Sequence, residues 1–357
     1  MKILTIIGAR PQFIKASAVS HALWEAGVQE VLLHTGQHYD ADMSKVFFDE
    51  LNIPEPDYHF ALGGGNHGAM TGAMMTAIEP VVLAEKPDWV LVYGDTNSTL
   101  AGALVASKLH VPVAHVEAGL RSFNRSMPEE INRICTDHVS DLLFCSSSAP
   151  LKLLAGEGIT KGVHEVGDVM ADSLALALRR SAAEPERLHR ILGRNHAPYA
   201  LMTLHRAENT DNPIRLRAIL EGIANLGPIL LPLHPRTGKA LASLGLSLPP
   251  NVKTVSPLGY LDMVSVLSGC ERVLTDSGGL QKEAWWARKP CITLRDETEW
   301  TETVSVGWNL IVGADSQKIQ ATATWNPPPF VGPDLYGGEG ASAKIATILQ
   351  TSIPILN

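Results

Sequence analysis

Short apolar segments alternate with segments of helical periodicity along the whole chain. Runs rich in Val, Ile and Leu fall at Ile3–Ile7, Glu30–His34, Trp89–Tyr93, Val111–Val116, Asp141–Cys145 and Val163–Val166. The segments between them, such as Phe13–Trp24, Ser98–Leu109 and Glu129–Val139, repeat apolar residues at the spacing of one helix face. Strands that are apolar throughout are typical of a parallel sheet covered by helices on both faces. The pattern therefore predicts an α/β fold.

The alternation pauses once and then begins again. Residues 168–194 are rich in Ala and Arg and have helical spacing, with no strand-like run. Further strand-like runs follow at Tyr199–Leu204, Ile229–Leu233, Val252–Val255, Arg272–Thr275, Cys291–Leu294 and Asn309–Val312. A chain of 357 residues is long enough for two domains of about 150–200 residues. We therefore expect two doubly wound, Rossmann-like domains, residues 1–168 and residues 169–344.

Composition narrows the range of partners. Lys and Arg number 29 and Asp and Glu number 37, so the formal net charge is −8, which argues against nucleic acid as the main partner. No apolar stretch is long enough for a membrane span, and the first residues predict a strand rather than a leader peptide, so we expect no membrane contact. The four cysteines stand apart among apolar residues, which is typical of buried thiols in a cytoplasmic protein. No metal site is predicted, because the His34 and His38 pair is only a weak candidate.

The residues that follow each strand are the most informative, because ligands of such folds bind at the carboxyl ends of the strands. After the first strand, "GARPQFIKA" places Arg10 and Lys15 near the start of a helix. The glycine pattern there is not the dinucleotide fingerprint. Two cations beside a helix N-terminus favour an anion site. The alternative is a solvated pair on a surface helix.

Carboxylates follow the next strands. Asp95 comes after Trp89–Tyr93, and Glu117 comes after Val111–Val116, so both are expected at one edge of the sheet. Glu129 lies a short distance further on, in "MPEEINR". Paired carboxylates are suited to proton transfer. Two structural alternatives stay open: Asp95 caps the next helix, and Ser126 with Glu129 forms a capping box.

The second half has its own polar residues after strands. His205 begins "HRAEN", and "LHPR" holds His234 and Arg236. The sharpest motif is "TDSGGLQKEA", in which Ser277, Gly278 and Gly279 open a helix and Glu283 lies one turn further on. Backbone N–H groups at such a turn bind phosphate, and a carboxylate at this distance accepts hydrogen bonds from two ribose hydroxyls. A plain glycine-rich turn is the alternative.

These motifs together resemble the non-hydrolysing UDP-N-acetylglucosamine 2-epimerase family. The resemblance rests on "GARPQFIKA", "TGQHYD", "GDTNSTLAGAL", "HVEAGLRSF", "MPEEINR", "HRAEN", "LHPR", "TDSGGLQKEA" and "RDETEW", and it covers essentially the whole chain. It implies a glycosyltransferase-B type fold, with two Rossmann-like domains facing a cleft and a C-terminal helix, residues 345–357, that packs back on the first domain. It also implies a homodimer, no redox cofactor, and a place in the synthesis of surface polysaccharide precursors.

The resemblance also implies roles for the residues. Asp95, Glu117, Glu129 and His205 match the family's catalytic positions. The residues implied in substrate binding are Arg10, Lys15, Arg133, His234, Arg236, Ser277, Gly278, Gly279 and Glu283. The implied reaction removes the proton from C2 of a UDP-2-acetamido sugar and expels UDP from C1. UDP then adds back to the 2-acetamidoglucal, and a proton returns to C2 from the other face.

Several points of substrate and regulation remain open. Family members activated by a second UDP-GlcNAc carry "QHREML" and an Arg before Gln-Thr-Leu, where this chain has "QHYDADM" and "GGNHGAMTG", so we expect no activation. "RSFNRSMPEE" and "TEW" look closer to enzymes acting on UDP-2,3-diacetamido-2,3-dideoxy-glucuronic acid, whose carboxylate Arg121 or Arg125 would bind. The rival functions are a glycosyltransferase of the same fold, a hydrolysing epimerase and a non-catalytic sugar-nucleotide binder.

Overall fold

The computed structural model describes residues 1–37, 54–194, 196–330 and 335–352, apart from the side chain of Arg10. The chain divides into two compact units, Met1–Leu176 together with Tyr336–Asn357, and Ala177–Leu335. The division falls inside helix α7 (Val169–Ala183), whereas the sequence pattern places it after residue 168. No helix in the described ranges is long and apolar enough to cross a membrane.

The first unit is built on a seven-stranded sheet in which every pairing is parallel. Its order is β3-β2-β1-β4-β5-β6-β7. The strands are β1 (Lys2–Ile7), β2 (Gln29–His34), β3 (Tyr58–His59), β4 (Trp89–Tyr93), β5 (Val113–Val116), β6 (Leu142–Cys145) and β7 (Val163–Glu165). The sequence pattern predicts all of these except β3, which is too short to give a periodic signal.

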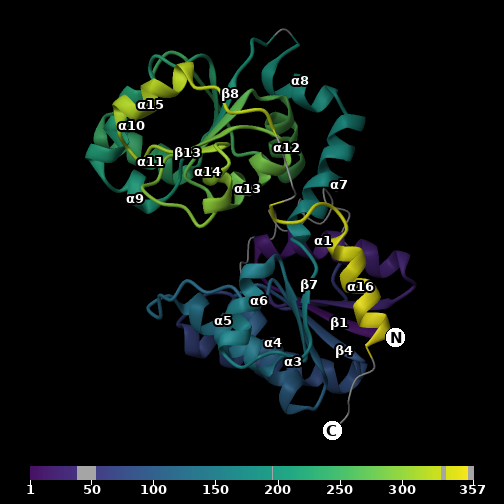
Figure 1. Cartoon of the computed structure of the whole chain (residues 1–357). Coiled ribbons are helices and arrows are strands. Elements are labelled where there is room, and N and C mark those ends of the chain that lie inside the picture. The colour runs from purple at the N-terminus through teal and green to yellow at the C-terminus, as the bar shows by residue number, and fades with distance from the viewer. Residues whose placement is uncertain (38–53, 195, 331–334, 353–357) are drawn as a thin grey trace. The chain divides into compact units, whose positions relative to one another are not determined.

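Helices cover both faces of this sheet (Figure 1). They are α1 (Arg10–Glu25), α3 (His67–Glu85), α4 (Asn97–Lys108), α5 (Pro128–Val139), α6 (Ser148–Gly156), the first part of α7, and α16 (Ala341–Thr351). The last helix, α16, packs against α1 although it is at the other end of the chain (Figure 1). The carboxylate of Asp172 in α7 accepts hydrogen bonds from the N–H groups of Gly340 and Ser342, which joins α7 to the start of α16. Residues 353–357 of the predicted last helix lie outside the described residues.

The second unit repeats the arrangement with six parallel strands in the order β10-β9-β8-β11-β12-β13. The strands are β8 (Ala200–Thr203), β9 (Ile229–Pro232), β10 (Val252–Val255), β11 (Arg272–Thr275), β12 (Cys291–Thr293) and β13 (Asn309–Ile311). The helices are the rest of α7, α8 (Glu186–Leu192), α9 (Ala207–Thr210), α10 (Pro213–Ile223), α11 (Pro235–Leu244), α12 (Tyr260–Gly269), α13 (Gly278–Trp286), α14 (Thr301–Ser305) and α15 (Ser316–Ala321). The prediction of two doubly wound parallel sheets is confirmed.

Each sheet has one point where the strand order reverses. In the first unit it lies between β1 and β4, and in the second it lies between β8 and β11. In folds of this kind the helices that follow such neighbouring strands leave on opposite faces, and ligands bind there, outside the carboxyl ends of the strands. Lys15 and Asp95 follow the first pair of strands, and His205 and Ser277 follow the second pair. The topology thus places these predicted site residues at the position in each unit where ligands of this fold class bind.

Candidate active site

The turn between β1 and α1 is fixed by one buried amide, that of Gln12. Its Oε1 accepts hydrogen bonds from the N–H groups of Gly8, at 2.7 Å, and Ala9, at 3.0 Å, and its Nε2 donates to the Tyr93 carbonyl at 2.8 Å. The same side chain therefore holds the start of α1 and the end of β4. A Cβ at Gly8 would lie within 2.2 Å of the hydroxyls of Ser98 and Thr35, so only glycine fits here.

Lys15 lies inside α1, and its ammonium donates a hydrogen bond to Oε2 of Glu117. The two side chains are 12% and 19% exposed. Burial lowers the pKa of Lys15, but the charge and hydrogen bond of Glu117 and the charges of Asp95 and Asp168 outweigh burial and hold this pKa above its ordinary value. Lys15 is therefore a charged group that faces two predicted catalytic carboxylates. The alternative of a solvated surface pair is therefore wrong for Lys15. The side chain of Arg10 lies outside the described residues.

Glu117 has a backbone conformation that is unusual for its residue type. Its φ is +71°, in the left-handed region, and the N–H groups of Glu117 and Ala118 both donate to the Phe144 carbonyl on β6. A Cβ at Gly94 would lie 3.3 Å from Glu117 Oε2 and 3.5 Å from Lys15 Nζ. The absence of a side chain at Gly94 thus leaves room for the ion pair beside the end of β4.

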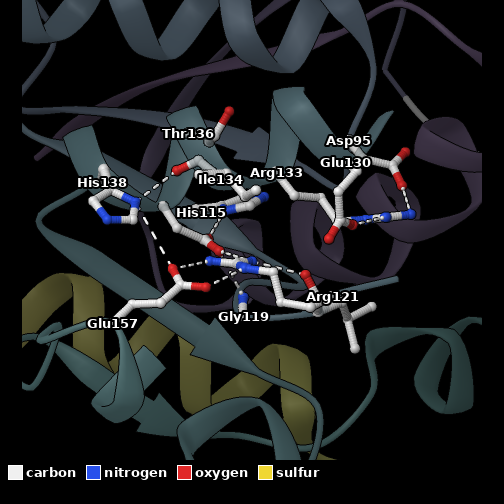
Figure 2. A network of polar contacts seen from close by, with 12 residues as sticks. Asp95, His115, Gly119, Arg121, Glu130, Arg133, Ile134, Thr136, His138 and Glu157 are labelled. Carbon is white, nitrogen blue, oxygen red and sulfur yellow. Dashed lines mark hydrogen bonds and ion pairs between the residues drawn. The ribbon is translucent and has the colours of Figure 1, made fainter. Parts of the chain in front are cut away.

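Asp95 forms an ion pair and is not a helix cap. Its Oδ2 lies 2.5 Å from Nη2 of Arg133 on α5, and Nη1 of Arg133 lies 2.9 Å from Oε2 of Glu130 (Figure 2). Helix α4 is capped one residue later, by Thr96, whose hydroxyl accepts from the Thr99 N–H. The capping alternative for Asp95 is therefore wrong. Arg133, predicted to bind substrate, orients a predicted catalytic carboxylate.

Glu129 is placed differently from the other two predicted catalytic carboxylates. It lies in the first turn of α5 and is exposed, and its carboxylate forms no hydrogen bond or ion pair with another described residue. The N-cap of α5 is Met127, and the hydroxyl of Ser126 donates to Asn124 instead. The capping box of Ser126 and Glu129 is therefore wrong, and the Glu129 carboxylate is accessible from solvent.

Sequence reasoning missed a buried network of charges beside these residues. Asp137 on α5 contacts His115 on β5 and Arg121. Arg121 also contacts Glu157 (Figure 2). The only sequence signals are a histidine inside an apolar strand and the spacing of Glu130, Arg133 and Asp137, which puts them on one helix face. Because the Arg121 side chain is 1% exposed and engaged by two carboxylates, the expectation that it binds a sugar carboxylate is wrong. Arg125 is exposed.

In the second unit, a buried carboxylate fixes the position of His205. Asp276, which is 0% exposed, accepts hydrogen bonds from the N–H of His205, at 3.0 Å, and from the N–H of Arg206, at 2.9 Å. It also accepts one from the side chain of Asn209 at 3.2 Å. Asp276 directly precedes Ser277, so one side chain joins the carboxyl ends of β8 and β11. The imidazole of His205 itself is partly exposed.

The ring of His234 lies beside that of His205, and Arg236 follows two residues later in the chain. The rings of His205 and His234 have centroids 5.4 Å apart. His234 caps α11, and its Nδ1 accepts from the Arg236 N–H at 3.2 Å. The guanidinium of Arg236 forms an ion pair with Asp211 at 2.6 Å, and this pair is exposed. His205 and His234 are thus brought together, while the charge of Arg236 is already balanced within its own unit.

The glycine-rich turn forms the start of α13. Ser277 is its N-cap, with a hydroxyl that accepts from the Leu280 N–H, and the Gly278 carbonyl accepts from Trp300 Nε1 at 2.8 Å. The space beside Gly278 and Gly279 is open enough that a Cβ at either would lie no closer than 3.5 Å to another atom. The turn therefore combines a helix N-terminus with backbone that a phosphate can approach.

Glu283 lies one turn into α13 and carries a perturbed carboxyl group. Burial raises its pKa to about 7, although the contact with Tyr260 and the charge of Lys282 lower it in part. A carboxyl group with this pKa changes its charge near neutral pH. Its hydrogen-bonding capacity therefore depends on pH in the range where enzymes work.

No group of three or more His, Cys, Asp or Glu residues in the described part of the chain has the geometry to hold a metal ion. His38 of the weak candidate pair lies outside the described residues. The four cysteines all lie in the described ranges, where they are free thiols, and Cys135 is the one that is partly exposed.

Comparison with known proteins identifies the family. The model of the UDP-N-acetylglucosamine 2-epimerase family matches residues 21–350. The chain belongs to this family. It is 54% identical to the UDP-2,3-diacetamido-2,3-dideoxy-D-glucuronate 2-epimerase of Pseudomonas aeruginosa, over 98% of this chain and 99% of the relative. It is 46% identical to the UDP-N-acetylglucosamine 2-epimerase of Methanocaldococcus jannaschii, over 89% of this chain and 90% of the relative.

Solved structures of family members have the same fold as this epimerase. The structure of the M. jannaschii enzyme in complex with UDP-GlcNAc and UDP aligns with a TM-score of 0.84 and 41% identity, covering 99% of this chain and 100% of that one. The Neisseria meningitidis enzyme bound to UDP-GlcNAc aligns with a TM-score of 0.85 and 29% identity, with the same coverage. The two-sheet architecture is therefore the glycosyltransferase-B type fold of these enzymes, as predicted.

Proposed function

We propose that this family member inverts C2 of a UDP-2-acetamido sugar, converting UDP-GlcNAc to UDP-ManNAc without hydrolysing it and without a cofactor. The observation that carries the proposal is the arrangement at the two strand-order reversals. The first holds two carboxylates, Asp95 and Glu117, each beside a cation. The second holds His205 and the glycine-rich turn that begins at Ser277. Proton transfer and diphosphate binding are the two tasks of the reaction.

The proposed reaction is an elimination followed by an addition. A base removes the proton from C2, the C2 electron pair forms the C1–C2 double bond, and the C1–O bond breaks so that UDP leaves with its electron pair. UDP then adds back to C1 of the 2-acetamidoglucal, and an acid returns a proton to the other face of C2. We assign these proton transfers to Asp95, Glu117 and Glu129, and we assign stabilisation of the leaving diphosphate to His205.

The chemistry of the glycine-rich turn supports binding of the UDP half of the substrate there. The free N–H groups of Gly278 and Gly279 and the helix N-terminus suit a phosphate, and Ser277 adds a hydroxyl. Glu283 is assigned to the ribose hydroxyls. The cationic or polar side chains assigned to the diphosphate and sugar are Arg10, Lys15, Arg133, His234 and Arg236.

A second candidate substrate is UDP-2,3-diacetamido-2,3-dideoxy-glucuronic acid. It is favoured by the 54% identity to the P. aeruginosa enzyme named for that sugar. The exposed guanidinium of Arg125, in the loop between β5 and α5, is a cation suited to the additional carboxylate. Both candidates undergo the same chemistry at C2, so the proposed mechanism does not depend on the choice.

We also propose a cytoplasmic homodimer that serves the synthesis of surface polysaccharide precursors. The free thiols of the four cysteines suit a reducing compartment. Light scattering on the purified protein, read against the monomer mass of 38.4 kDa, tests the dimer.

The decisive experiment follows both UDP-sugars by NMR in D2O. If the proposal is right, the 2-epimer forms and carries deuterium at C2, because the abstracted proton is replaced from an exchangeable group. UDP and free sugar should not accumulate, in contrast to a hydrolysing epimerase. Epimerised product without deuterium at C2 contradicts the elimination route, and transfer of the sugar to an added acceptor favours a glycosyltransferase.

A further inference from the structure

The carboxylate of Asp137 contacts the turn that carries Glu117 directly, and it reaches the turn that carries Asp95 through His115. Its Oδ1 lies 2.7 Å from Nδ1 of His115. Its Oδ2 accepts hydrogen bonds from the Gly119 N–H, at 3.1 Å, and from Nη1 of Arg121, at 2.6 Å. The side chains of Asp137 and His115 are both fully buried. Neither residue touches solvent, so neither is placed to meet the substrate.

His115 connects the carboxylate of Asp137 to the backbone just before Asp95. Nε2 of His115 lies 2.7 Å from the carbonyl oxygen of Gly94, which belongs to the peptide group that joins Gly94 to Asp95. The N–H of Gly94 donates to the Val116 carbonyl at 2.9 Å. Two residues of β5 therefore fix Gly94: Val116 binds its N–H, and His115 binds its carbonyl. The contact with His115 fixes the orientation of the peptide group between Gly94 and Asp95.

Gly119 connects the carboxylate of Asp137 to the turn that carries Glu117. Both residues have left-handed backbones, with φ of +71° at Glu117 and +78° at Gly119. The left-handed conformation is unfavourable for a non-glycine residue such as Glu117. It persists only where contacts with the surrounding structure stabilise it. The hydrogen bond from the Gly119 N–H to Asp137 closes the turn at its far end. Asp137 thereby fixes the direction in which the Glu117 side chain leaves the sheet.

The hydrogen bonds also define the charge state of the network. A carbonyl oxygen only accepts, so Nε2 of His115 donates to Gly94. Burial raises the pKa of Asp137, but the contacts with His115 and Arg121 lower it by more, so Asp137 is a carboxylate and also only accepts. Each ring nitrogen of His115 lies within hydrogen-bond distance of an oxygen acceptor, Nδ1 of the Asp137 carboxylate and Nε2 of the Gly94 carbonyl. A charged, fully paired network is stiff, because each partner that moves leaves a buried charge uncompensated.

We propose that Asp137 and His115 are positioning residues for the epimerisation, which hold Asp95 and Glu117 at the spacing that proton removal and return require. This inference rests on the proposed function. Since Asp137 and His115 act through other residues, replacing them should change the rate of the chemical steps and leave binding of UDP unchanged.

A matched pair of substitutions at His115 tests the proposal. A glutamine amide places its nitrogen near the position of Nε2, so His115→Gln keeps a donor for the Gly94 carbonyl. An asparagine amide is shorter, so His115→Asn keeps only the contact with Asp137. We expect His115→Asn to lower kcat about 100-fold, as a displacement of about 1 Å does, and His115→Gln to lower it less than tenfold. The Kd of UDP, measured by calorimetry, should stay within twofold for both variants.

The ratio of products separates positioning from stability. When the acid that returns the proton is displaced, more of the 2-acetamidoglucal should escape before UDP adds back, so the ratio of released glycal to epimer rises in His115→Asn. Loss of folded protein lowers both products together and leaves their ratio unchanged. Glu157→Gln is the control, because it weakens only the outer contacts of the network, those of Glu157 with Arg121 and His138. It should lower Tm with an unchanged product ratio.

Three outcomes overturn the proposal or its basis. Equal kcat values and product ratios for His115→Asn and His115→Gln would show that the contact with Gly94 does not position Asp95. If His115→Asn does not fold, the nearly isosteric Asp137→Asn takes its place, and an unchanged kcat in that variant equally excludes positioning. If the wild-type protein places no deuterium on C2 of either UDP-sugar, the proposed function fails, whatever the variants do.

Discussion

Lys15 and Glu117 form an ion pair although 102 positions separate them in the sequence. The pair joins helix α1 to the end of strand β5, and both side chains are largely buried. The cation thus stabilises a carboxylate within the unit, and it remains close enough to serve the chemistry proposed there. A residue with both roles affects stability and rate together, and a double substitution separates the two effects.

We predict that Lys15→Met and Glu117→Gln each lower kcat by about 100-fold or more, because each removes a group positioned for proton transfer or charge stabilisation. Lys15→Met alone should also destabilise the protein by about 3 kcal/mol, because it leaves a buried carboxylate unpaired. The double variant Lys15→Met/Glu117→Gln should regain much of that stability and none of the activity. Urea unfolding and the NMR assay measure the two effects. An equally unstable double variant would contradict the pairing.

The hydrogen bonds of Glu130 predict a loss of stability at acid pH. Burial raises the pKa of Glu130, but hydrogen bonds from Ser122, Phe123 and Arg133 lower it by more, so the pKa in the folded state lies below the ordinary value of 4.5. A carboxylate with a depressed pKa contributes stability above pH 4.5 that is lost as the pH falls through the folded-state value.

Glu130→Gln should therefore lower the free energy of unfolding by about 1–3 kcal/mol at pH 7. The difference in this free energy between the variant and wild type should shrink as the pH falls below 4.5. Urea unfolding at several pH values measures it. Glu129→Gln, at the neighbouring exposed position, is the control and should show no such trend. A difference that does not vary with pH would mean that Glu130 contributes packing rather than charge.

The raised pKa of Glu283 predicts that stability and substrate binding change in opposite directions with pH. Because burial raises its pKa to about 7, the folded state binds the proton more tightly than the unfolded chain does. The stability from this group is present below pH 4.5 and is lost as the pH rises through 7. Wild type should therefore lose stability relative to Glu283→Gln between pH 5 and pH 8.

Binding should change in the other direction, because only the carboxylate accepts hydrogen bonds from two ribose hydroxyls. The affinity for a UDP-sugar should weaken up to about tenfold per pH unit below 7 and should be flat in Glu283→Gln. Calorimetry measures it, with Glu221→Gln on α10 as a control that keeps the wild-type profile. A wild-type affinity that is independent of pH would remove Glu283 from the ribose role.

Arg125 provides a test of the sugar. If the substrate is the diacetamido-uronate nucleotide, Arg125→Gln should lower kcat/KM for it by about 10- to 100-fold, the loss expected for a charge-assisted hydrogen bond. The same variant should change kcat/KM for UDP-GlcNAc less than twofold, since that sugar has no carboxylate. Equal effects on the two nucleotides, or faster turnover of UDP-GlcNAc by the wild type, would favour the neutral sugar.

The departure from the activator motifs predicts simple kinetics. Most of "QHYDADM" lies outside the described residues, so the prediction rests on the sequence alone. Initial rate should rise hyperbolically with the concentration of either nucleotide. A sigmoidal curve, or turnover of one nucleotide only when UDP-GlcNAc is also added, would show that a second binding site exists.

The sequence by itself determines all but one of the strands and the edges of the sheets where the site residues lie. Apolar runs as short as Trp89–Tyr93 are sufficient, because a strand buried on both faces has no polar position to interrupt it. A parallel sheet places every carboxyl end at the same edge, so the positions of Asp95, Glu117 and His205 follow from chain order alone. The family resemblance then suggests roles for them that spacing does not.

Only the tertiary structure decides which partner each of these side chains has. Asp95 and Thr96 are equally good caps in the sequence, and the helix begins where Thr96 caps it, which releases Asp95 to Arg133. Similarly, Arg121 and Arg125 look alike in the sequence, yet one is buried against Asp137 and the other is exposed. Such pairings depend on the rotation of each helix about its axis and on its distance from the next strand. Packing of the whole unit sets both quantities, and no local pattern of residues contains them.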